Sequence, residues 1–221
     1  MLIEPIARIK NDYNSKFGIP RQSGRADTEG IIVFEKPYQN RDYIKGLNQF
    51  SHLWLIWEFS ENTDKKVNAT VRPPRLGGNK RVGVFASRSP FRPNHLGLSC
   101  VQLKEIVETK DGCSLIVSGA DLMNGTPIYD IKPYIPYTDC IEKAHGGYAE
   151  DNKTYALTVN IDETLLNKIP NEKQKNLIDL LKDDPRPAYH NSSQRVYGFS
   201  FANFEIRFKV CDNVLTVISI E

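Results

Sequence analysis

The sequence predicts a mainly β protein, built as a barrel or sandwich and followed by a small α+β appendage. About seven short apolar segments lie between residues 3 and 137, separated by turns rich in glycine and proline. Closely spaced short strands of this kind are typical of barrels and sandwiches. After residue 139 the chain becomes polar, and one helical pattern and several strand patterns follow.

The first predicted strands are Ile3–Lys10 and Thr28–Phe34, the second of which is rich in β-branched side chains. The loop between them contains Pro20 and several hydrogen-bond donors. Tyr43–Phe50 predicts one or two helical turns. Ser51–Phe59 is the most apolar segment of the chain. Because it is short, aromatic and bounded by polar residues, it predicts a buried strand.

A proline-stiffened loop, GVFASRSPFRPNHLGLS, occupies Gly83–Ser99. A strand is expected at Arg81–Ala86, so that Val84, Phe85 and Ala86 form its buried end. Arg88 and Arg92 then lie four residues apart, and the two prolines restrict the backbone around them. Two guanidinium groups in a rigid loop suit the binding of an anion or stacking on an aromatic ring. The alternative is a surface hairpin with solvated arginines.

A β-hairpin is predicted next, because Leu98–Val107 and Ser114–Ala120 are apolar segments separated by the turn sequence Lys110-Asp111-Gly112. Asp121–Pro127 is rich in Asn and Gly and predicts a turn. Residues 128–137 contain two prolines and are expected to be extended.

The second part of the chain begins with a polar, glycine-containing segment at 140–154, expected to be a linker or an exposed excursion. A strand is expected at Tyr155–Ile161 and a helix from Glu172, with Pro170 just before it. The last three strands are expected at Tyr197–Phe201, Phe204–Val210 and Val214–Ile220. We therefore divide the chain into a β domain at 1–139, the linker at 140–154 and a small α+β domain at 155–221.

The composition excludes several classes of protein. Forty per cent hydrophobic and 25% charged residues are ordinary for a globular chain. No segment approaches the roughly 18 apolar residues of a membrane span, and the start lacks the layout of a signal peptide, so we expect a cytoplasmic protein without membrane contact. The four cysteines are scattered with no CxxC pair. They are expected to be small buried hydrophobes, with no metal site.

Positive charge is concentrated in one window. No Asp or Glu occurs between Lys65 and Lys104, although the chain as a whole has a net charge of only +2. Nine basic residues lie in this window: Lys65, Lys66, Arg72, Arg75, Lys80, Arg81, Arg88, Arg92 and Lys104. Such a basic face predicts an anionic partner, most plausibly nucleic acid. A solvated basic face without a partner is the alternative.

The common nucleotide and hydrolase motifs are missing. The sequence has no GxGxxG, no GxxxxGK[ST], no GxSxG and no HExxH. The four histidines are dispersed. His52 precedes a predicted buried strand and is expected to be structural, whereas His95 lies in the proline-stiffened loop and is a candidate for ligand contact.

Five motifs occur in one order: KFGIPRQSG, FSHLWLIW, VRPPRLGGNKRVGVFASRSPFRPNHLGLS, DLMNGTPIYDIKPYIPY and DPRPAYH. With them the chain resembles the TrmO family, also called TsaA-like or UPF0066, over nearly its whole length. The resemblance implies a single closed β-barrel with a small C-terminal domain, working as a homodimer. It also implies a tRNA methyltransferase that uses S-adenosylmethionine. The implied substrate is N6 of the threonylcarbamoyl-adenosine 3′ of the anticodon, so the tRNA anticodon loop is the implied partner.

The resemblance further implies a set of contacts to S-adenosylmethionine, in the first loop, after the aromatic strand, around the proline-stiffened loop and in the DLMNGTP turn. These residues are Pro20, Arg21, Gln22, Ser60, Glu61, Arg88, Leu98, Asn124, Gly125, Thr126 and Pro127. The chain departs from its relatives in two places. Relatives often have His and another polar residue at Ser60 and Glu61, and Asp at Asn124, although an Asn side chain can still bond a hydroxyl.

A base that removes the N6 proton would assist methyl transfer, because the N6 lone pair is delocalised. Asp130, Lys132 and Tyr134 are the candidates, since alternate residues of an extended segment share one face. Lys132 is expected to lower the pKa of the Tyr134 phenol, and Asp130 to accept a proton directly. The alternative is a structural salt bridge between Asp130 and Lys132.

The residues expected to contact RNA are Arg72, Arg75, Lys80, Arg81, Arg92, Asn94 and Arg186. Either Arg92 with Asn94, or Arg186, is expected to pair with the carboxylate of the threonyl group. Because Arg186 lies in the C-terminal domain, the sequence leaves open whether it reaches the site of the partner subunit in a dimer. Two other functions remain open at this point: a non-catalytic RNA-binding barrel, and a methyltransferase of the same fold with another RNA or a small molecule as its substrate.

Overall fold

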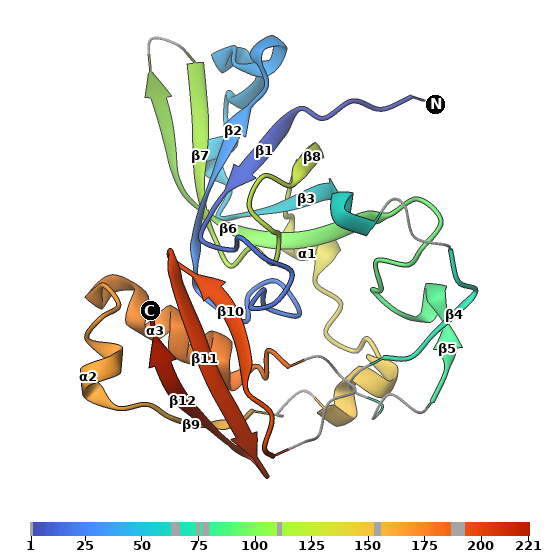
Figure 1. Cartoon of the computed structure of the whole chain (residues 1–221). Helices are drawn as coiled ribbons and strands as arrows, with labels where there is room; N and C mark the ends of the chain where they lie inside the picture. The colour runs from blue at the N-terminus through green and yellow to red at the C-terminus, as the bar shows by residue number, and fades with distance from the viewer. Residues whose placement is uncertain are drawn as a thin grey trace.

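A closed, antiparallel six-stranded β-barrel forms the first part of the molecule, with strand order β1-β2-β7-β6-β3-β8 (Figure 1). The structure, a computed structural model, describes residues 2–62, 67–73, 76, 80–109, 112–152, 156–186 and 193–221. The barrel strands are β1 (Ala7–Lys10), β2 (Glu29–Phe34), β3 (His52–Glu58), β6 (Leu96–Thr109), β7 (Gly112–Ser118) and β8 (Pro127–Pro133). The predicted mainly β fold with a barrel is therefore confirmed.

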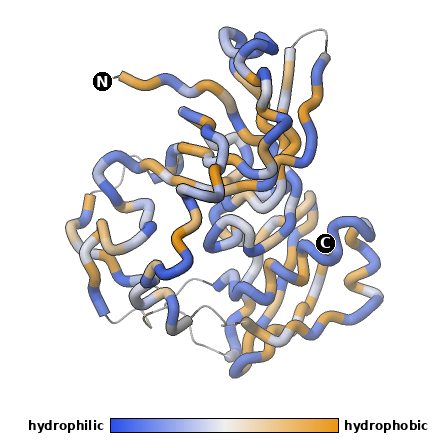
Figure 2. The backbone as a smooth tube through the Cα atoms, turned by 180° about the vertical axis from the view of Figure 1, so that it is seen from behind, coloured by the Kyte–Doolittle hydropathy of each residue, from blue (hydrophilic) through white to orange (hydrophobic). Residues whose placement is uncertain are grey.

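Strand β3 shows how the sequence determines the barrel interior. Leu53, Leu55 and Trp57 are buried, whereas the residues between them are only partly buried. Successive side chains of a strand point to opposite faces, so the odd positions fill the barrel and the even positions line its outer surface. Figure 2 shows hydrophobic stretches of the backbone in both the barrel and the C-terminal sheet.

The segment after Arg81 differs from the prediction of a longer buried strand. Only Val82–Gly83 form a strand, β5, which pairs with β4 (Thr70–Val71) as a separate ribbon. Val84–Ala86 form a 3-10 helix, η6, and the Phe85 side chain is 79% exposed. The physical cause is local, because the backbone N–H and hydroxyl of Ser87 both donate to the Val84 carbonyl and close a turn.

Short 3-10 helices connect the barrel strands. They are η1 (Lys36–Tyr38), η2 (Arg41–Ile44), η3 (Leu47–Gln49) and η4 (Ser60–Asn62). The helical turns predicted near residues 43–50 are thus confirmed. The stretch predicted as extended up to Tyr137 instead ends in a short helix, α1 (Pro136–Asp139). Pro136 stands at the first helical position, where its fixed φ suits a helix and its missing N–H costs nothing.

The C-terminal part is a four-stranded sheet covered by helices. Its strands follow the order β10-β11-β12-β9, and β9 runs parallel to β12. Its elements are β9 (Thr158–Asn160), α2 (Glu163–Leu166), α3 (Asn171–Lys182), β10 (Tyr197–Phe201), β11 (Phe204–Cys211) and β12 (Val214–Ile220). The strand predicted at Phe204–Val210 is confirmed as β11, and its alternate residues Ile206, Phe208 and Val210 are buried.

The loop after β1 contributes to the hydrophobic core of the C-terminal domain. Tyr13, from the loop after β1, is buried within the C-terminal cluster, and Ile19 packs against the same cluster. The Tyr13 hydroxyl donates to Thr28 Oγ1 at 2.6 Å, and burial raises the pKa of this phenol. The loop between β1 and β2 is therefore held by the C-terminal domain as well as by the barrel.

Between α1 and β9 the described residues are mostly exposed and include a 3-10 helix, η7 (Gly147–Asn152). The prediction that the cysteines are buried is correct for Cys113 and wrong for Cys140 and Cys211, which are exposed. Cys140 follows α1 at the start of this exposed segment, and Cys211 lies beside an exposed turn.

Neither a metal-binding group nor a membrane helix occurs in the described part of the chain. No cluster of His, Cys, Asp or Glu there could hold a metal ion. Within the same residues, no helix combines the length and the apolar character that a membrane crossing requires.

Candidate active site

A cavity of about 580 Å³ opens at the end of the barrel where β3 and β6 meet the loop after β1 and the proline-stiffened loop. Eight of the eleven predicted cofactor contacts line it: Pro20, Arg21, Gln22, Ser60, Glu61, Arg88, Leu98 and Thr126. The first and the last of them, Pro20 and Thr126, are more than a hundred residues apart in the sequence. A second depression of about 650 Å³ between η2 and β6 contains none of the predicted site residues.

The wall of the cavity depends on close packing between β3 and β6. A Cβ atom at Gly97 would lie only 2.3 Å from the Trp57 ring, so only glycine lets the indole lie against the β6 backbone. The indole N–H donates to Ser99 Oγ at 2.9 Å. The ring is thereby fixed both by packing and by a hydrogen bond.

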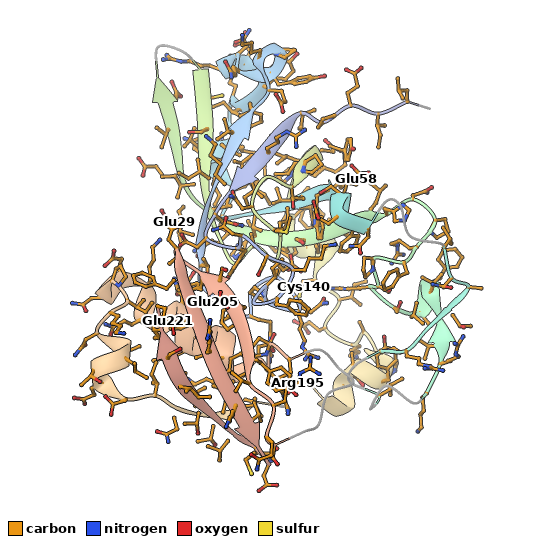
Figure 3. The ribbon with its side chains drawn as sticks, viewed as in Figure 1. Glu29, Glu58, Cys140, Arg195, Glu205 and Glu221 are labelled. Carbon is orange, nitrogen blue, oxygen red and sulfur yellow. The ribbon has the colours of Figure 1, made fainter. Side chains whose placement is uncertain are left out.

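Glu58 lies at the mouth of the cavity, at the end of β3 (Figure 3). Its carboxylate accepts a hydrogen bond of 2.7 Å from the Tyr129 hydroxyl. Burial, together with this carboxylate, raises the pKa of Tyr129 to about 12. The phenol is therefore a neutral donor that holds Glu58 in place.

Arg88 and the first loop meet across the cavity. A guanidinium N–H of Arg88 donates to Gln22 Oε1, and Gln22 Nε2 donates to the Arg21 carbonyl at 2.6 Å. Arg88 is exposed, so the rest of its guanidinium remains accessible from the cavity side. The arrangement suits the binding of an anionic group at the rim.

The C-terminal domain is bound to the loop between β1 and β2 by hydrogen bonds and an ion pair. The sequence did not predict this contact. The Arg21 backbone N–H donates to Asp183 Oδ2 at 3.2 Å, and the Arg21 guanidinium donates to the Asp184 carbonyl at 2.7 Å. Arg25 pairs with Asp183 at 2.9 Å, and this carboxylate is 8% exposed. Arg21 thus serves as a link between the domains as well as a cavity wall.

The three predicted contacts that do not line the cavity belong to the DLMNGTP turn or its end: Asn124, Gly125 and Pro127. The Asn124 amide accepts from the Asn11 N–H at 3.2 Å and donates to Asn14 Oδ1 at 3.0 Å. Gly125 adopts a φ of 82°, which favours glycine. In this structure the turn supports the cavity by fastening itself to the loop after β1.

Asp121 is a cavity residue that sequence reasoning missed. Ser99 Oγ donates to its carboxylate. Burial raises the pKa of Asp121, opposed by the Ser99 hydroxyl, nearby backbone N–H groups and Arg88. Its position at the start of the DLMNGTP motif, directly after an apolar strand, was a signal that could have identified it.

None of the three candidate catalytic residues lines the cavity: Asp130 and Lys132 lie on the outer face of β8, and Tyr134 directly follows that strand. Lys132 pairs with Asp130 at 2.9 Å, so the salt bridge considered as the alternative is present. The expected lowering of the Tyr134 pKa is wrong. Desolvation and then Cys140 (labelled in Figure 3) raise this pKa, and Lys132 is paired with Asp130 instead.

Strand register places Asp130 nearest to the cavity. Asp130 lies opposite Ile56, which in turn lies opposite Leu98 of the cavity wall. Two interstrand spacings of about 4.8 Å separate Asp130 from Leu98. Lys132 is opposite Trp54, two residues farther from this end of the strands.

Five of the seven predicted RNA contacts fall into two groups. Arg72, Lys80 and Arg81 are exposed around the β4–β5 ribbon, which projects beside the barrel (Figure 1). Asn94 is exposed in the proline-stiffened loop, and Arg92 lines the cavity. Arg75, with Lys65 and Lys66, lies outside the described residues.

Arg186 is already engaged within the chain. Its guanidinium donates twice to the Asp184 carboxylate, at 2.8 Å each, and its side chain is 12% exposed. Arg92 is different, because it lines the cavity and one of its N–H groups is anchored on the Ser87 carbonyl at 3.1 Å. Of the two arginines, Arg92 is therefore the better placed for a ligand in the cavity.

Comparison with known proteins identifies relatives over both parts of the chain. The model of the tRNA-methyltransferase O N-terminal domain matches residues 8–140, and that of the TrmO C-terminal domain matches residues 154–221. The chain is 38% identical to the tRNA (adenine(37)-N6)-methyltransferase of Escherichia coli K12, covering 99% of this chain and 97% of the relative. It is 41% identical to the Eikenella corrodens protein of the same name, covering 73% and 91%.

The fold comparison agrees. A solved structure, "Crystal structure of TrmO", superposes with a TM-score of 0.79 at 28% identity, covering 100% of this chain and 98% of that one. A second, "Crystal structure of TrmO from P. areuginosa", gives a TM-score of 0.79 at 29% identity, covering 100% and 96%.

Proposed function

Because the chain belongs to the TrmO family, we propose that it is an S-adenosylmethionine-dependent tRNA methyltransferase acting on N6 of adenosine 37. We further propose that this adenosine already carries a threonylcarbamoyl group. The observation that carries the proposal is the cavity that collects eight predicted cofactor contacts from separate motifs.

The cavity fits the chemistry of this cofactor. Its volume of about 580 Å³ lies within the usual range for small-molecule sites, roughly 300–1,000 Å³. Trp57, Leu98 and Met123 give it an apolar wall for an adenosine moiety, and Arg88 at the rim suits the carboxylate of an amino-acid moiety. When bound, the cofactor supplies a methyl group on an electrophilic sulfonium.

The protein's task is to bring N6 to within roughly 3 Å of the methyl group and to exclude water. An anticodon loop presents unstacked bases, so the adenine can be turned toward the cavity. Asp130 is our proposed proton acceptor, because strand register brings it nearest to the cavity. Lys132 then orients this carboxylate, and Tyr134, with its raised pKa, has no role as a base.

We assign tRNA docking to the surface around the β4–β5 ribbon. Exposed Arg72, Lys80 and Arg81 provide positive charge for phosphates, and exposed Phe85 offers a ring on which a base can stack. We also propose a homodimer, as the family resemblance implies, in which a partner subunit completes the RNA-binding surface.

The direct test is methyl transfer in a defined system. The purified protein should bind S-adenosylmethionine and transfer its labelled methyl group to tRNA from a strain that lacks this gene. Mass spectrometry of the digested tRNA should then find the label on N6 of adenosine 37. Absence of cofactor binding would favour a non-catalytic RNA-binding barrel, and label on another nucleoside would favour a different RNA substrate.

Charge reversal on the docking surface should separate tRNA binding from cofactor binding. Arg72→Glu with Lys80→Glu should weaken tRNA binding about tenfold or more. Each lost phosphate contact should also reduce the slope of log affinity against log salt by roughly 0.7–0.9. Titrations of labelled tRNA at several salt concentrations measure both quantities.

The matched control reverses two exposed lysines elsewhere, Lys36→Glu with Lys175→Glu. This control changes the net charge equally but should leave the salt slope nearly unchanged. Equal losses in the two double variants would mean that net charge, and not this surface, governs docking.

A further inference from the structure

The carboxylate of Asp121 is held rigidly at the cavity wall by a chain of hydrogen bonds. The Trp57 indole donates to Ser99 Oγ at 2.9 Å, and Ser99 Oγ donates to Asp121 Oδ1. The Ser23 backbone N–H also acts on this carboxylate and lowers its pKa. Trp57 is itself buried against Gly97, and Ser99 is 1% exposed, so the whole chain of donors has little freedom to move.

A residue that only lined the cavity would not need to be held by such a series of hydrogen bonds. Asp121 follows the end of β7 and is the first residue of the turn that fastens to the loop after β1. Because its donor Ser99 belongs to β6 and is itself held by Trp57 of β3, two barrel strands fix the position of one negative charge. A charge fixed in this way needs no reorganisation when a cation arrives, which is the condition for strong electrostatic recognition.

Asp121 is incompletely neutralised. Arg88 lowers its pKa, but this arginine is exposed and donates to Gln22, so solvent screens much of its effect. Burial acts in the opposite direction and raises the pKa of Asp121. A partly buried carboxylate beside apolar Trp57, Leu98 and Met123 is therefore placed to be stabilised by a cationic ligand.

The charges of the proposed cofactor match this arrangement. Its amino-acid end is a zwitterion without net charge, which suits the exposed rim where Arg88 and Glu61 carry opposite charges. Its sulfonium is a lone positive charge between apolar groups. The cavity wall offers the corresponding feature at Asp121, a partly buried negative charge beside apolar side chains, whereas the carboxylate at the end of β3, that of Glu58, is already bonded to Tyr129.

We propose that Asp121 is a specificity-determining residue that places its negative charge beside the sulfonium, so that the cavity prefers the charged methyl donor to its neutral thioether product. The inference rests on the proposed function. It has a consequence for turnover, since loss of the positive charge on methyl transfer removes the attraction to Asp121 and favours release of the product.

The test compares two ligands in one variant. Calorimetry should measure the binding of S-adenosylmethionine and of S-adenosylhomocysteine to the wild type and to Asp121→Asn. The Asn side chain has nearly the same shape and can still accept the Ser99 hydrogen bond, but it lacks the charge. Affinity for S-adenosylmethionine should fall at least about tenfold, whereas affinity for S-adenosylhomocysteine should change less than about twofold.

Two controls make the outcome decisive. Asp212→Asn makes the same chemical change in an exposed turn of the C-terminal sheet and should leave both affinities unchanged. Partial unfolding of Asp121→Asn would reduce both affinities by the same factor, so the ratio of the two reports selectivity even in a destabilised variant. Ser99→Ala keeps the charge but loosens its position, and should reduce the ratio by a smaller factor.

The possible results separate this inference from the function on which it rests. If the wild type fails to bind S-adenosylmethionine, the proposed function is wrong. If the wild type binds it, and Asp121→Asn loses both ligands equally or neither, the function stands and the role of Asp121 beside the sulfonium is overturned.

Discussion

A tRNA that lacks the threonylcarbamoyl group should be methylated at least about a hundredfold more slowly than the same tRNA carrying it. Arg92 lines the cavity and one of its N–H groups is anchored on Ser87, so the rest of its guanidinium can pair with the threonyl carboxylate. Sites built around a polar partner discriminate strongly against substrates without it, because the site's own polar group is then left unpaired. Single-turnover rates on one transcript, prepared with and without the group, measure the ratio.

Arg92→Ala provides the internal control for this expectation. If the carboxylate pairs with Arg92, the variant should methylate the modified tRNA slowly and should gain little from the presence of the group. Removing both partners should then cost about as much as removing one, which is the behaviour of two groups that act together. Equal wild-type rates on the two transcripts would instead show that the threonylcarbamoyl group is not recognised.

Arg88→Ala should weaken the binding of S-adenosylmethionine about tenfold to a hundredfold. The guanidinium lies at the cavity rim, and a hydrogen bond to a charged group contributes about 1.5–3 kcal/mol. Because Arg88 is exposed and lies in a loop, the thermal midpoint of the variant should stay close to that of the wild type. Isothermal calorimetry gives the affinity, and a melting curve checks the fold.

Two further variants sharpen this result. Arg88→Lys keeps the charge but cannot form a bidentate pair, so an intermediate affinity is expected. Lys80→Ala removes an exposed cation from the same basic window but away from the cavity, and should leave cofactor affinity unchanged. An Arg88→Ala protein with wild-type affinity would remove Arg88 from the cofactor site.

Local sequence patterns were sufficient to predict the structure of segments whose conformation depends on their own side chains. The alternation of Ile206, Phe208 and Val210 identified the buried face of β11, and the β6–β7 hairpin followed from two apolar segments around a short turn. Period-two alternation is a property of consecutive residues, so it can be recognised without knowing what the strand packs against.

Local sequence patterns failed where a nearby hydrogen bond set a different backbone conformation. The apolar residues Val84–Ala86 resembled the end of a strand, but Ser87 turns the backbone and leaves Phe85 exposed. Residues 128–137 were expected to be extended because they contain two prolines, yet Pro136 begins a helix whose Asp139 accepts the Ile135 N–H at 2.8 Å. Proline is compatible with both structures, so composition did not decide between them.

The sequence by itself determined the order of most strands along the chain, the family and eight of the residues that line the cavity, because these follow from motifs that are contiguous in the chain. Only the tertiary structure decided how those motifs act together. It brought Ser99 to Asp121, Arg25 to Asp183 and Arg88 to Gln22, pairs separated by 22 to 158 residues. Such pairs form only when the barrel closes and the C-terminal domain packs on its first loop, and no local pattern encodes that event.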